Sequence, residues 1–585
     1  MRYFLLLLLV LPQVLSGATS RPMYTPDSIY LFGVVNDQGQ HYEDLWQRGL
    51  RAVTFELQWK LYEPQEGLYD QTYIDHMKGL LRSLNERGWF VQLVPGIHYA
   101  PMWVFTNYPD SYYVNQFGDK YDPDPLTQGD FRVINAPFNP QARTLISGYL
   151  AKIFQDFDQS DQLLQFDSIR VGAGPQGELR YPPAQWNGKS NSYWAFDAFA
   201  QSSAASGIPQ QAVGWRPGID DNPGSINRGQ LLINPGFEEK YQYFPLPGWS
   251  PDDEVIAEQS SEMAQSGNQS LKITLFSNNR IHQYVRVTPG QNYEIGGWAA
   301  SQNGDGIARI IVTQYNASQQ LIDGAPFVKL ETNQNTYTQL STEITIRPDT
   351  SFLKFEMDGD RPGIYYFDNV WLRRSGEANQ PDRDIIVPME FYNWYVDSMT
   401  NYQNWQISEI RKYYNGQLDL VYAGKGVRLN QITDALNNDL KGDGWSESSA
   451  GLYGGADYLR HVSGLTDNHI ALYMTGIEDP PEDKIDDTSP FAGQWSGARW
   501  LSELAHTHNF TIWGENSGGN TRAEMDVAIK RMRQNGFIGL MWAHESQLYT
   551  NPNPNNYASA DDYQKIVEFF MHENRIYLPL VDIDR

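Results

Sequence analysis

The chain has 585 residues, too many for a single hydrophobic core, so its length predicts two or three domains. Its 70 acidic and 44 basic residues give a net charge of -26, which repels phosphate backbones and anionic lipids and excludes nucleic acid and membrane surfaces as expected partners. The absence of cysteine excludes disulfides, thiolate metal sites and a lipid-modified cysteine.

The N-terminal segment has the pattern of a secretory signal peptide. Arg2 precedes an apolar run over residues 4–10, and the small residues at 16–18 are typical of a cleavage site. The apolar run is too short to span a bilayer, which disfavours a membrane anchor. We therefore expect residues 1–18 to be removed and the mature protein to be secreted, without membrane contact.

Strand and helix patterns alternate through residues 19–228. The short apolar runs that predict strands are 29–35, 51–59, 90–94 and 168–171. The segments that predict helices are 42–49, 74–88 and 142–157. This alternation at steady spacing is typical of a parallel α/β fold.

The helical pattern is lost between residues 229 and 374. The alternating runs that replace it are 270–276, 293–299, 308–315, 342–346, 352–357 and 365–372. Gly, Pro, Asn and Asp separate these runs, which predicts an all-β sandwich. The segment LINPGFE (232–238) and the closing segment YFDNV (366–370) resemble the ends of jelly-roll carbohydrate-binding modules.

The α/β pattern returns in residues 375–585. A long aromatic-rich helix is predicted at 388–413 and a closing helix at 561–573. The predicted strands of this part are 418–422, 470–474, 511–513 and 537–542. The eight strands together predict a (β/α)8 TIM barrel, with the jelly-roll sandwich inserted after the fourth barrel strand.

Two of the predicted barrel strands are followed by a glutamate. Glu178 follows the fourth strand on a turn rich in glycine and proline, and Glu515 follows the seventh strand. Catalytic groups of such barrels come from the carboxyl ends of several strands. A glycosidase needs two carboxyl groups that flank the scissile bond, and one of them protonates the leaving oxygen. The pair predicts hydrolysis of O-glycosidic bonds in a poly- or oligosaccharide, with Glu178 as the general acid.

Four other side chains near strand ends are candidates for substrate contact: Trp59, Arg180, Tyr181 and Trp542. Aromatic rings cover the apolar face of a pyranose while the sugar hydroxyls keep their hydrogen bonds. A tryptophan in a barrel is as often part of the hydrophobic core, so this alternative stays open for both tryptophans.

The segment GAGPQGELRYP (172–182) resembles the segment that carries the general acid in β-amylases, glycoside hydrolase family 14. Glu515 with Asn516 is similar to the pair that presents the base carboxylate of that family. Thr475 and Glu478 are similar to residues of its inner loop. The resemblance implies a reaction that inverts the anomeric centre, with Glu515 activating water.

The same resemblance implies substrate-binding roles for Glu56 and His98, but other positions depart from the family. Trp542 stands where the family has an arginine, and its glucose-binding lysine is absent, with Arg428 nearby. The mobile loop that closes over starch has no counterpart after His98. Specificity for α-1,4-glucan therefore stays open.

Two alternatives remain. A retaining β-galactosidase-like or other β-glycan hydrolase has a similar barrel, although such enzymes usually carry Asn before the acid, whereas here Gly177 does. A non-catalytic glycan-binding protein, with the sandwich as its working part, is the second alternative.

No cofactor is expected, because no His, Asp or Glu cluster has metal-ligand spacing. A structural calcium ion on Glu238 and Asp368 ranks below a metal-free sandwich, and the oligomeric state is left open.

Overall fold

The computed structural model describes residues 30–35, 40–124, 131–172, 174–220, 230–240, 246–252, 255–277, 279–317, 320–376, 385–424, 426–427, 429–437, 439–440, 449–467, 469–479, 487–489, 495–518, 521–543, 545–549 and 556–577. The segment predicted to be a signal peptide and Arg428 lie outside these residues. Among the helices of the described residues, none combines the length and apolar composition that crossing a bilayer requires.

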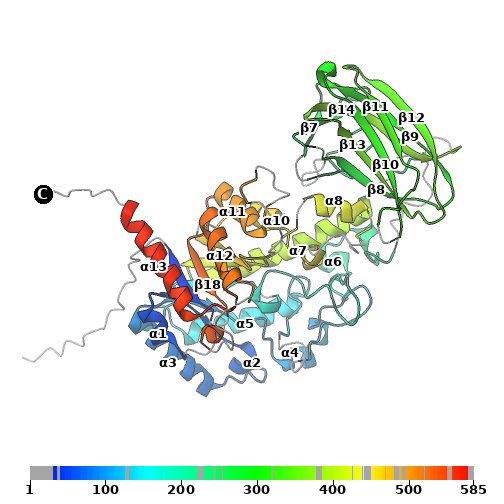
Figure 1. The fold of residues 1–585 in the computed structure, drawn as a ribbon. Coiled ribbons are helices and arrows are strands. Elements are labelled where there is room, and N and C mark those ends of the chain that lie inside the picture. Colours follow the sequence, from blue (N-terminus) through cyan, green and yellow to red (C-terminus); the bar gives the residue numbers. More distant parts are fainter. Residues whose placement is uncertain are drawn as a thin grey trace, which may run out of the picture.

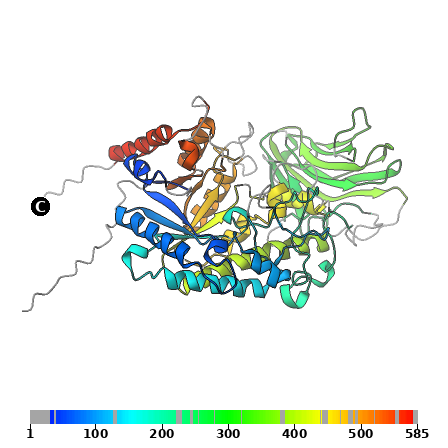
Figure 2. The same ribbon diagram turned by 90° about the horizontal axis from the view of Figure 1, so that it is seen from below.

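Eight parallel strands close into a barrel in the order β1-β18-β17-β16-β15-β4-β3-β2 (Figures 1 and 2). The strands are β1 (Leu31–Val34), β2 (Ala52–Glu56), β3 (Phe90–Val94), β4 (Ser168–Val171), β15 (Gln417–Tyr422), β16 (Ile470–Thr475), β17 (Thr511–Glu515) and β18 (Gly539–Trp542). Each lies within or overlaps a predicted strand, which confirms the predicted barrel.

Helices surround the barrel strands (Figure 2). Their bounds are α1 (Tyr42–Gln47), α2 (Trp59–Tyr62), α3 (Gln71–Arg87), α4 (Met102–Asn107), α5 (Pro140–Asp156), α6 (Ser203–Ser206), α7 (Ile386–Arg411), α8 (Leu429–Asn437), α9 (Ser449–Gly454), α10 (Tyr458–Ser463), α11 (Gly497–His508), α12 (Arg522–Gln534) and α13 (Ala560–Tyr577). Local sequence sets their ends: the side chain of Asp70 caps α3 by accepting the Tyr73 N–H at 3.0 Å, and the left-handed Gly88 ends that helix.

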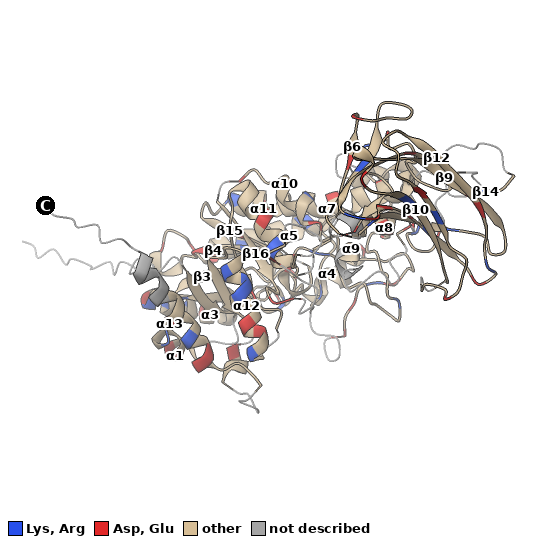
Figure 3. Cartoon of the chain, turned by 45° about the horizontal axis from the view of Figure 1, so that its top comes forward, with Lys and Arg blue, Asp and Glu red and all other residues tan. Residues whose placement is uncertain are grey.

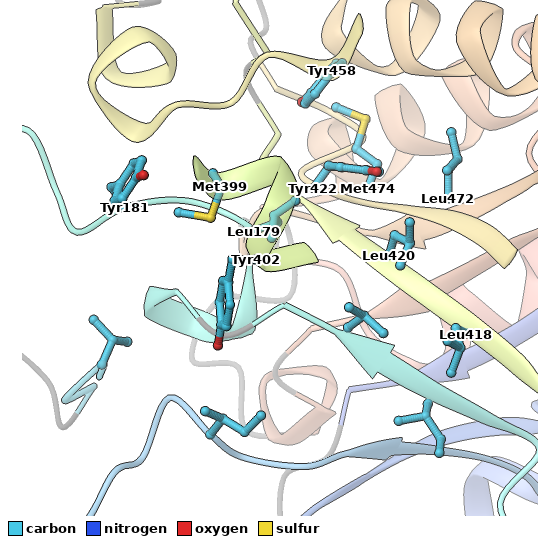
Figure 4. Close-up of a cluster of buried hydrophobic side chains, with 14 of the residues drawn as sticks. Leu179, Tyr181, Met399, Tyr402, Leu418, Leu420, Tyr422, Tyr458, Leu472 and Met474 are labelled. Carbon is cyan, nitrogen blue, oxygen red and sulfur yellow. The ribbon is translucent and has the colours of Figure 1, made fainter. Parts of the chain in front are cut away.

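Each barrel strand sends alternate side chains outward to the helices and inward to the barrel axis. Leu418 and Leu420 of β15 pack outward with residues of the neighbouring strand and α7 (Figure 4). Asp419, which lies between them, faces the axis and is fully buried. The apolar part of the interior is one small cluster: Ala52, Val421, Ala471, Tyr473, Trp513 and Met541.

The inserted segment folds into two five-stranded antiparallel sheets (Figure 1). The first contains β11 (Val328–Thr332), β10 (Ala308–Tyr315), β13 (Phe352–Gly359), β8 (Ile281–Arg286) and β5 (Ser250–Pro251). The second contains β12 (Thr338–Thr345), β9 (Asn292–Ser301), β14 (Gly363–Arg374), β7 (Ser270–Leu275) and β6 (Val255–Ser260). The predicted sandwich is confirmed, although β5, β6, β8 and β11 were not predicted. In β8, His282 and Gln283 interrupt the apolar alternation although both are buried.

The sandwich begins and ends side by side, because Gln230 and Arg373 form an antiparallel bridge. It contacts the barrel part of the chain through α8. Asp434 of α8 accepts a hydrogen bond from the Ser250 hydroxyl, and Asn437 of α8 donates to the Gly248 carbonyl at 2.7 Å. Charged residues lie on both parts of the molecule (Figure 3).

Candidate active site

A cavity of about 500 Å³ opens at the carboxyl ends of the barrel strands. Its wall includes Glu56, His98, Arg170, Glu178, Arg180, Thr475, Glu515, Asn516, Ser517 and Ala543. The carboxyl ends of the strands are where (β/α)8 barrels hold their catalytic groups. Both predicted catalytic carboxylates therefore lie on one cavity.

The loop after β4 holds Glu178 at the cavity in a fixed backbone conformation. Gly174 donates its N–H to the Glu178 carbonyl at 2.8 Å, and a Cβ at position 174 would lie 2.1 Å from the Arg180 carbonyl oxygen. Gly177 has a φ of +76°, and a Cβ there would meet the His98 ring at 3.2 Å. These glycines allow the tight turn and the close approach of the backbone at Gly177 to the His98 ring.

The carboxylate of Glu178 has two polar partners. Its Oε2 forms an ion pair with Arg180, and its Oε1 lies within hydrogen-bonding distance of the Thr475 hydroxyl. The same hydroxyl lies 3.3 Å from the carbonyl oxygen of Tyr422, a group that can only accept. When Thr475 donates to Tyr422, its oxygen can accept a hydrogen bond from protonated Glu178. This arrangement accommodates Glu178 both as a carboxylate and as an acid.

Glu515 ends β17 and is held more rigidly. Its Oε2 accepts hydrogen bonds from Arg170 of β4 at 2.5 Å and from the Tyr473 hydroxyl of β16 at 2.9 Å. Arg170 also lies over the Tyr473 ring, with its guanidinium carbon 4.2 Å from the ring centre. Both partners are buried and can donate to a carboxylate without moving.

Sequence analysis missed these partners of Glu515. Two of the strands carry the partners themselves, Arg170 and Tyr473, at inward positions between outward apolar residues. A third strand carries Asp419 at a position of the same kind. Polar side chains at alternate positions of buried strands are the signal that would have found them, since such groups must have partners inside the barrel.

Five of the ten residues predicted to bind substrate line the cavity. Glu56 and His98 line it, with His98 Nε2 3.5 Å from Glu56 Oε1. Arg180, Thr475 and Asn516 line it as well. The Asn516 side chain accepts the Ala543 N–H at 2.6 Å, which ties the ends of β17 and β18 together.

Three aromatic residues predicted to contact substrate are buried in the core instead. Trp542 points outward from β18, because Met541 and Ala543 on either side of it face the interior. Trp59 begins α2, where it stacks on Tyr149 with ring centres 4.8 Å apart.

The third, Tyr181, donates its hydroxyl to the Tyr395 carbonyl at 2.9 Å and lies among the side chains of Figure 4. None of the three lines the cavity, and their core packing corrects the prediction of substrate contact.

Glu478 is buried behind the cavity wall. It accepts hydrogen bonds from the N–H of Ser517 at 2.7 Å and from its hydroxyl at 2.6 Å. Burial raises the pKa of Glu478 to about 7, although the Ser517 hydrogen bonds oppose the shift. Ser517 lines the cavity, so Glu478 supports the wall beside Glu515.

The carboxylates proposed as calcium ligands contact backbone amides. Glu238 accepts the N–H of Asn268 at 2.9 Å, and Asp368 accepts the N–H of Gln265 at 2.7 Å. Within the described ranges, no group of three or more His, Asp and Glu side chains is arranged to hold a metal ion.

Residues 34–146 match a family model of glycoside hydrolases, Glyco_hydro_42, described as beta-galactosidase. Among solved structures, the catalytic domain of β-amylase from Paenibacillus polymyxa is 11% identical, with 93% of this chain and 99% of that chain covered and a TM-score of 0.49. The CBM22-1 xylan-binding domain from Paenibacillus barcinonensis Xyn10C is 18% identical, with 26% and 99% covered and a TM-score of 0.22. No curated protein matches the sequence. The family match supports a glycosidase.

Proposed function

We propose that the protein is a glycoside hydrolase that cleaves a poly- or oligosaccharide, with Glu178 as general acid and Glu515 as general base. One observation carries the proposal: two carboxylates from different strand ends line the same cavity, and their surroundings differ. A pair of carboxyl groups in unlike environments is what acid–base hydrolysis of a glycoside requires.

The difference between the two surroundings assigns the roles. Arg170 and Tyr473 both donate to Glu515 from buried positions, and a carboxylate is the form that accepts two such bonds. The partner of Glu178 is Arg180, whose side chain is 24% exposed and also bonds Gln176 at 2.6 Å. An entering sugar can displace Arg180, after which the Thr475 hydroxyl can accept a hydrogen bond from protonated Glu178 until the proton passes to the glycosidic oxygen.

Substitution of each carboxylate tests these roles. We expect Glu178→Gln and Glu515→Gln to lower the release of reducing sugar by about 10²–10⁴-fold, because each removes one proton-transfer group. Glu503→Gln, which removes an exposed carboxylate on α11, serves as the control. The substrates are soluble starch, xylan and β-1,4-galactan. Activity of Glu178→Gln equal to the wild type on any of them would refute the assignment.

Inversion is the favoured outcome at the anomeric carbon. It is supported by the β-amylase-like segments around Glu178 and Glu515, in which the second carboxylate activates water. Proton NMR of the first-formed product should show the anomer opposite to that of the substrate. Detection of the substrate's own anomer would show that Glu515 attacks carbon directly.

A retaining β-glycoside hydrolase is the second candidate, and the match of residues 34–146 to the beta-galactosidase family model favours it. In that case Glu515 would be the nucleophile, and a covalent glycosyl-enzyme would form on it. Preferential hydrolysis of β-galactan over starch, together with a retained anomer, would select this candidate.

We also infer that the protein is exported, from the signal-like residues 1–18. Expression with its own N-terminus in a bacterial host should yield a mature chain shortened by about 18 residues outside the cytoplasm, the size of segment that signal peptidases remove. Mass spectrometry of the secreted chain would check this. Full-length protein retained inside the cells would count against it.

A further inference from the structure

Below the cavity floor, polar side chains connect four barrel strands in one line. Arg170 donates through Nε to the Gln92 side-chain oxygen at 2.7 Å. Gln92 donates in turn to Asp419 at 2.6 Å. Gln92 and Asp419 are completely buried, and neither lines the cavity. The line therefore reaches Glu515 from a region that substrate does not touch.

The orientation of the Gln92 amide follows from the chemistry of its neighbours. Arg170 can only donate hydrogen bonds, and a carboxylate such as Asp419 can only accept them. The Gln92 oxygen must therefore face Arg170 and its nitrogen must face Asp419. The opposite orientation would set N–H groups against N–H groups on one side and oxygen against oxygen on the other.

Asp419 is itself fixed by further donors. Its second oxygen accepts the indole N–H of Trp513 at 3.0 Å and the amide of Gln417 at 2.7 Å. Trp513 lies in β17, two residues before Glu515. The buried acid thus connects to the catalytic strand both through the backbone of β17 and through Arg170.

We propose that Asp419 and Gln92 are positioning residues that fix the guanidinium of Arg170, and thereby the carboxylate of Glu515, for catalysis. The proposal rests on the proposed function. The Gln92 oxygen holds Nε of the Arg170 guanidinium, and Nη2 of the same planar group donates to Glu515. Since misplacement of a reacting group by about 1 Å can lower the rate about 10²-fold, the gain from this alignment is large.

Replacement of Asp419 by Asn tests this line of hydrogen bonds and leaves the size of the side chain unchanged. The new amide must present an N–H to one of three donors, so the Gln92 amide loses its fixed orientation and Arg170 loses its acceptor. We expect kcat/KM to fall by about 10²-fold with KM nearly unchanged. Asp358→Asn, which alters an equally buried carboxylate in the sandwich, is the matched control.

A double variant tests whether Asp419 acts through Gln92. If it does, Gln92→Leu with Asp419→Asn is no slower than Gln92→Leu alone, because the first change already breaks the line. Gln403→Leu, a buried amide in the outer layer that bonds Tyr422, is the control for folding. A double variant whose loss is the product of the two single losses, or an Asp419→Asn enzyme with unchanged kcat/KM, would overturn the proposal.

A chemical measurement separates this proposal from the proposed function. Water-soluble carbodiimide couples amines to protonated carboxyl groups, and trypsin releases Glu515 together with the exposed Glu503 in one peptide, residues 500–522. The charged and titratable groups that line the cavity with Glu515 are Glu56, His98, Tyr99, Glu178, Arg180 and Asp479, and Arg170 and Tyr473 contact Glu515 from behind.

We expect the pH at which Glu515 becomes labelled to rise in Arg170→Met and Asp419→Asn, while labelling of Glu503 stays unchanged. The same midpoint in all proteins would overturn the positioning role, whether or not the enzyme hydrolyses any glycan tested. A shifted midpoint in a protein without glycosidase activity would instead refute the proposed function and retain the network.

Discussion

A buried cluster of charged side chains in the barrel can be compared with one in the sandwich. In the barrel, Arg170 pairs with Glu515 at the cavity. On the sandwich, Asp358 of β13 accepts both Nε and Nη2 of Arg309 at 2.6 and 2.7 Å. Arg280 lies 3.1 Å from Asp358 as well. Both clusters pair arginine with a carboxylate, and they differ in what the carboxylate faces.

In the sandwich the carboxylate is closed off by its arginines, and Asp358 has no exposed surface. In the barrel, Arg170 and Tyr473 donate to the Glu515 carboxylate from buried positions, and Glu515 itself lines the cavity. A buried ion pair is weak support for stability and weak support for function. The comparison shows that access to a cavity distinguishes the two, since only an accessible carboxylate can meet a substrate.

The largest expected effect comes from breaking the closed cluster. Asp358→Ala leaves Arg309 and Arg280 without their shared acceptor, and removal of one partner of a buried pair costs about 3 kcal/mol. Urea unfolding monitored by tryptophan fluorescence, to which Trp249, Trp298 and Trp371 of the sandwich contribute, should show this loss of stability. Turnover on soluble glycan should stay at the wild-type value. If Asp358→Ala lost activity without losing stability, the sandwich cluster would have a functional role like that of the barrel cluster.

A smaller effect is expected from the hydroxyl that bonds Glu178. Thr475→Val keeps the shape of the side chain and removes the hydroxyl that hydrogen-bonds Glu178. We expect kcat to fall about tenfold, equivalent to about 1.4 kcal/mol, because Glu178 loses a hydrogen-bonding partner. Thr475→Ser, which keeps the hydroxyl, is the control. An unchanged kcat in Thr475→Val would show that this hydroxyl does not assist the acid.

The sequence predicted the barrel strands well because their apolar runs are short and bounded by glycine, as at β3 and β4. It also located Glu178 and Glu515, since a carboxylate directly after such a run lies at the barrel mouth. It could not decide which way Trp542 points, because a shift of one residue in register reverses the facing of every side chain.

The contacts between Glu515 and its partners could not be predicted from the sequence, for a different reason. Arg170 and Tyr473 lie 303 residues apart along the chain, and only the closure of the barrel brings them together. Gln92 and Asp419 join them from two further strands. Sequence patterns describe one strand at a time, whereas this network depends on the order in which the strands close.

The smallest expected effect concerns His282, where the sandwich meets the barrel part of the chain. Its ring lies 3.3 Å from Asp252 of the sandwich and 3.7 Å from Asp434 of α8. Burial, the largest influence, lowers the pKa of His282, but hydrogen bonds to Asp252 and Asp434 outweigh it, so the net shift is upward. Lys354 also faces the ring and opposes this rise.

Because the folded-state pKa of His282 is raised above the unfolded value of 6.5, its contribution to stability is fully present below pH 6.5 and is lost as the pH rises through the folded-state value. We expect His282→Gln to lower the free energy of unfolding by about 1 kcal/mol at pH 5, because the buried ring loses its hydrogen bonds to Asp252 and Asp434. The difference should vanish at alkaline pH. His76→Gln, on the exposed face of α3, controls for loss of a histidine. A difference that grows with pH would mean that the neutral ring makes the stronger contact between the two parts of the molecule.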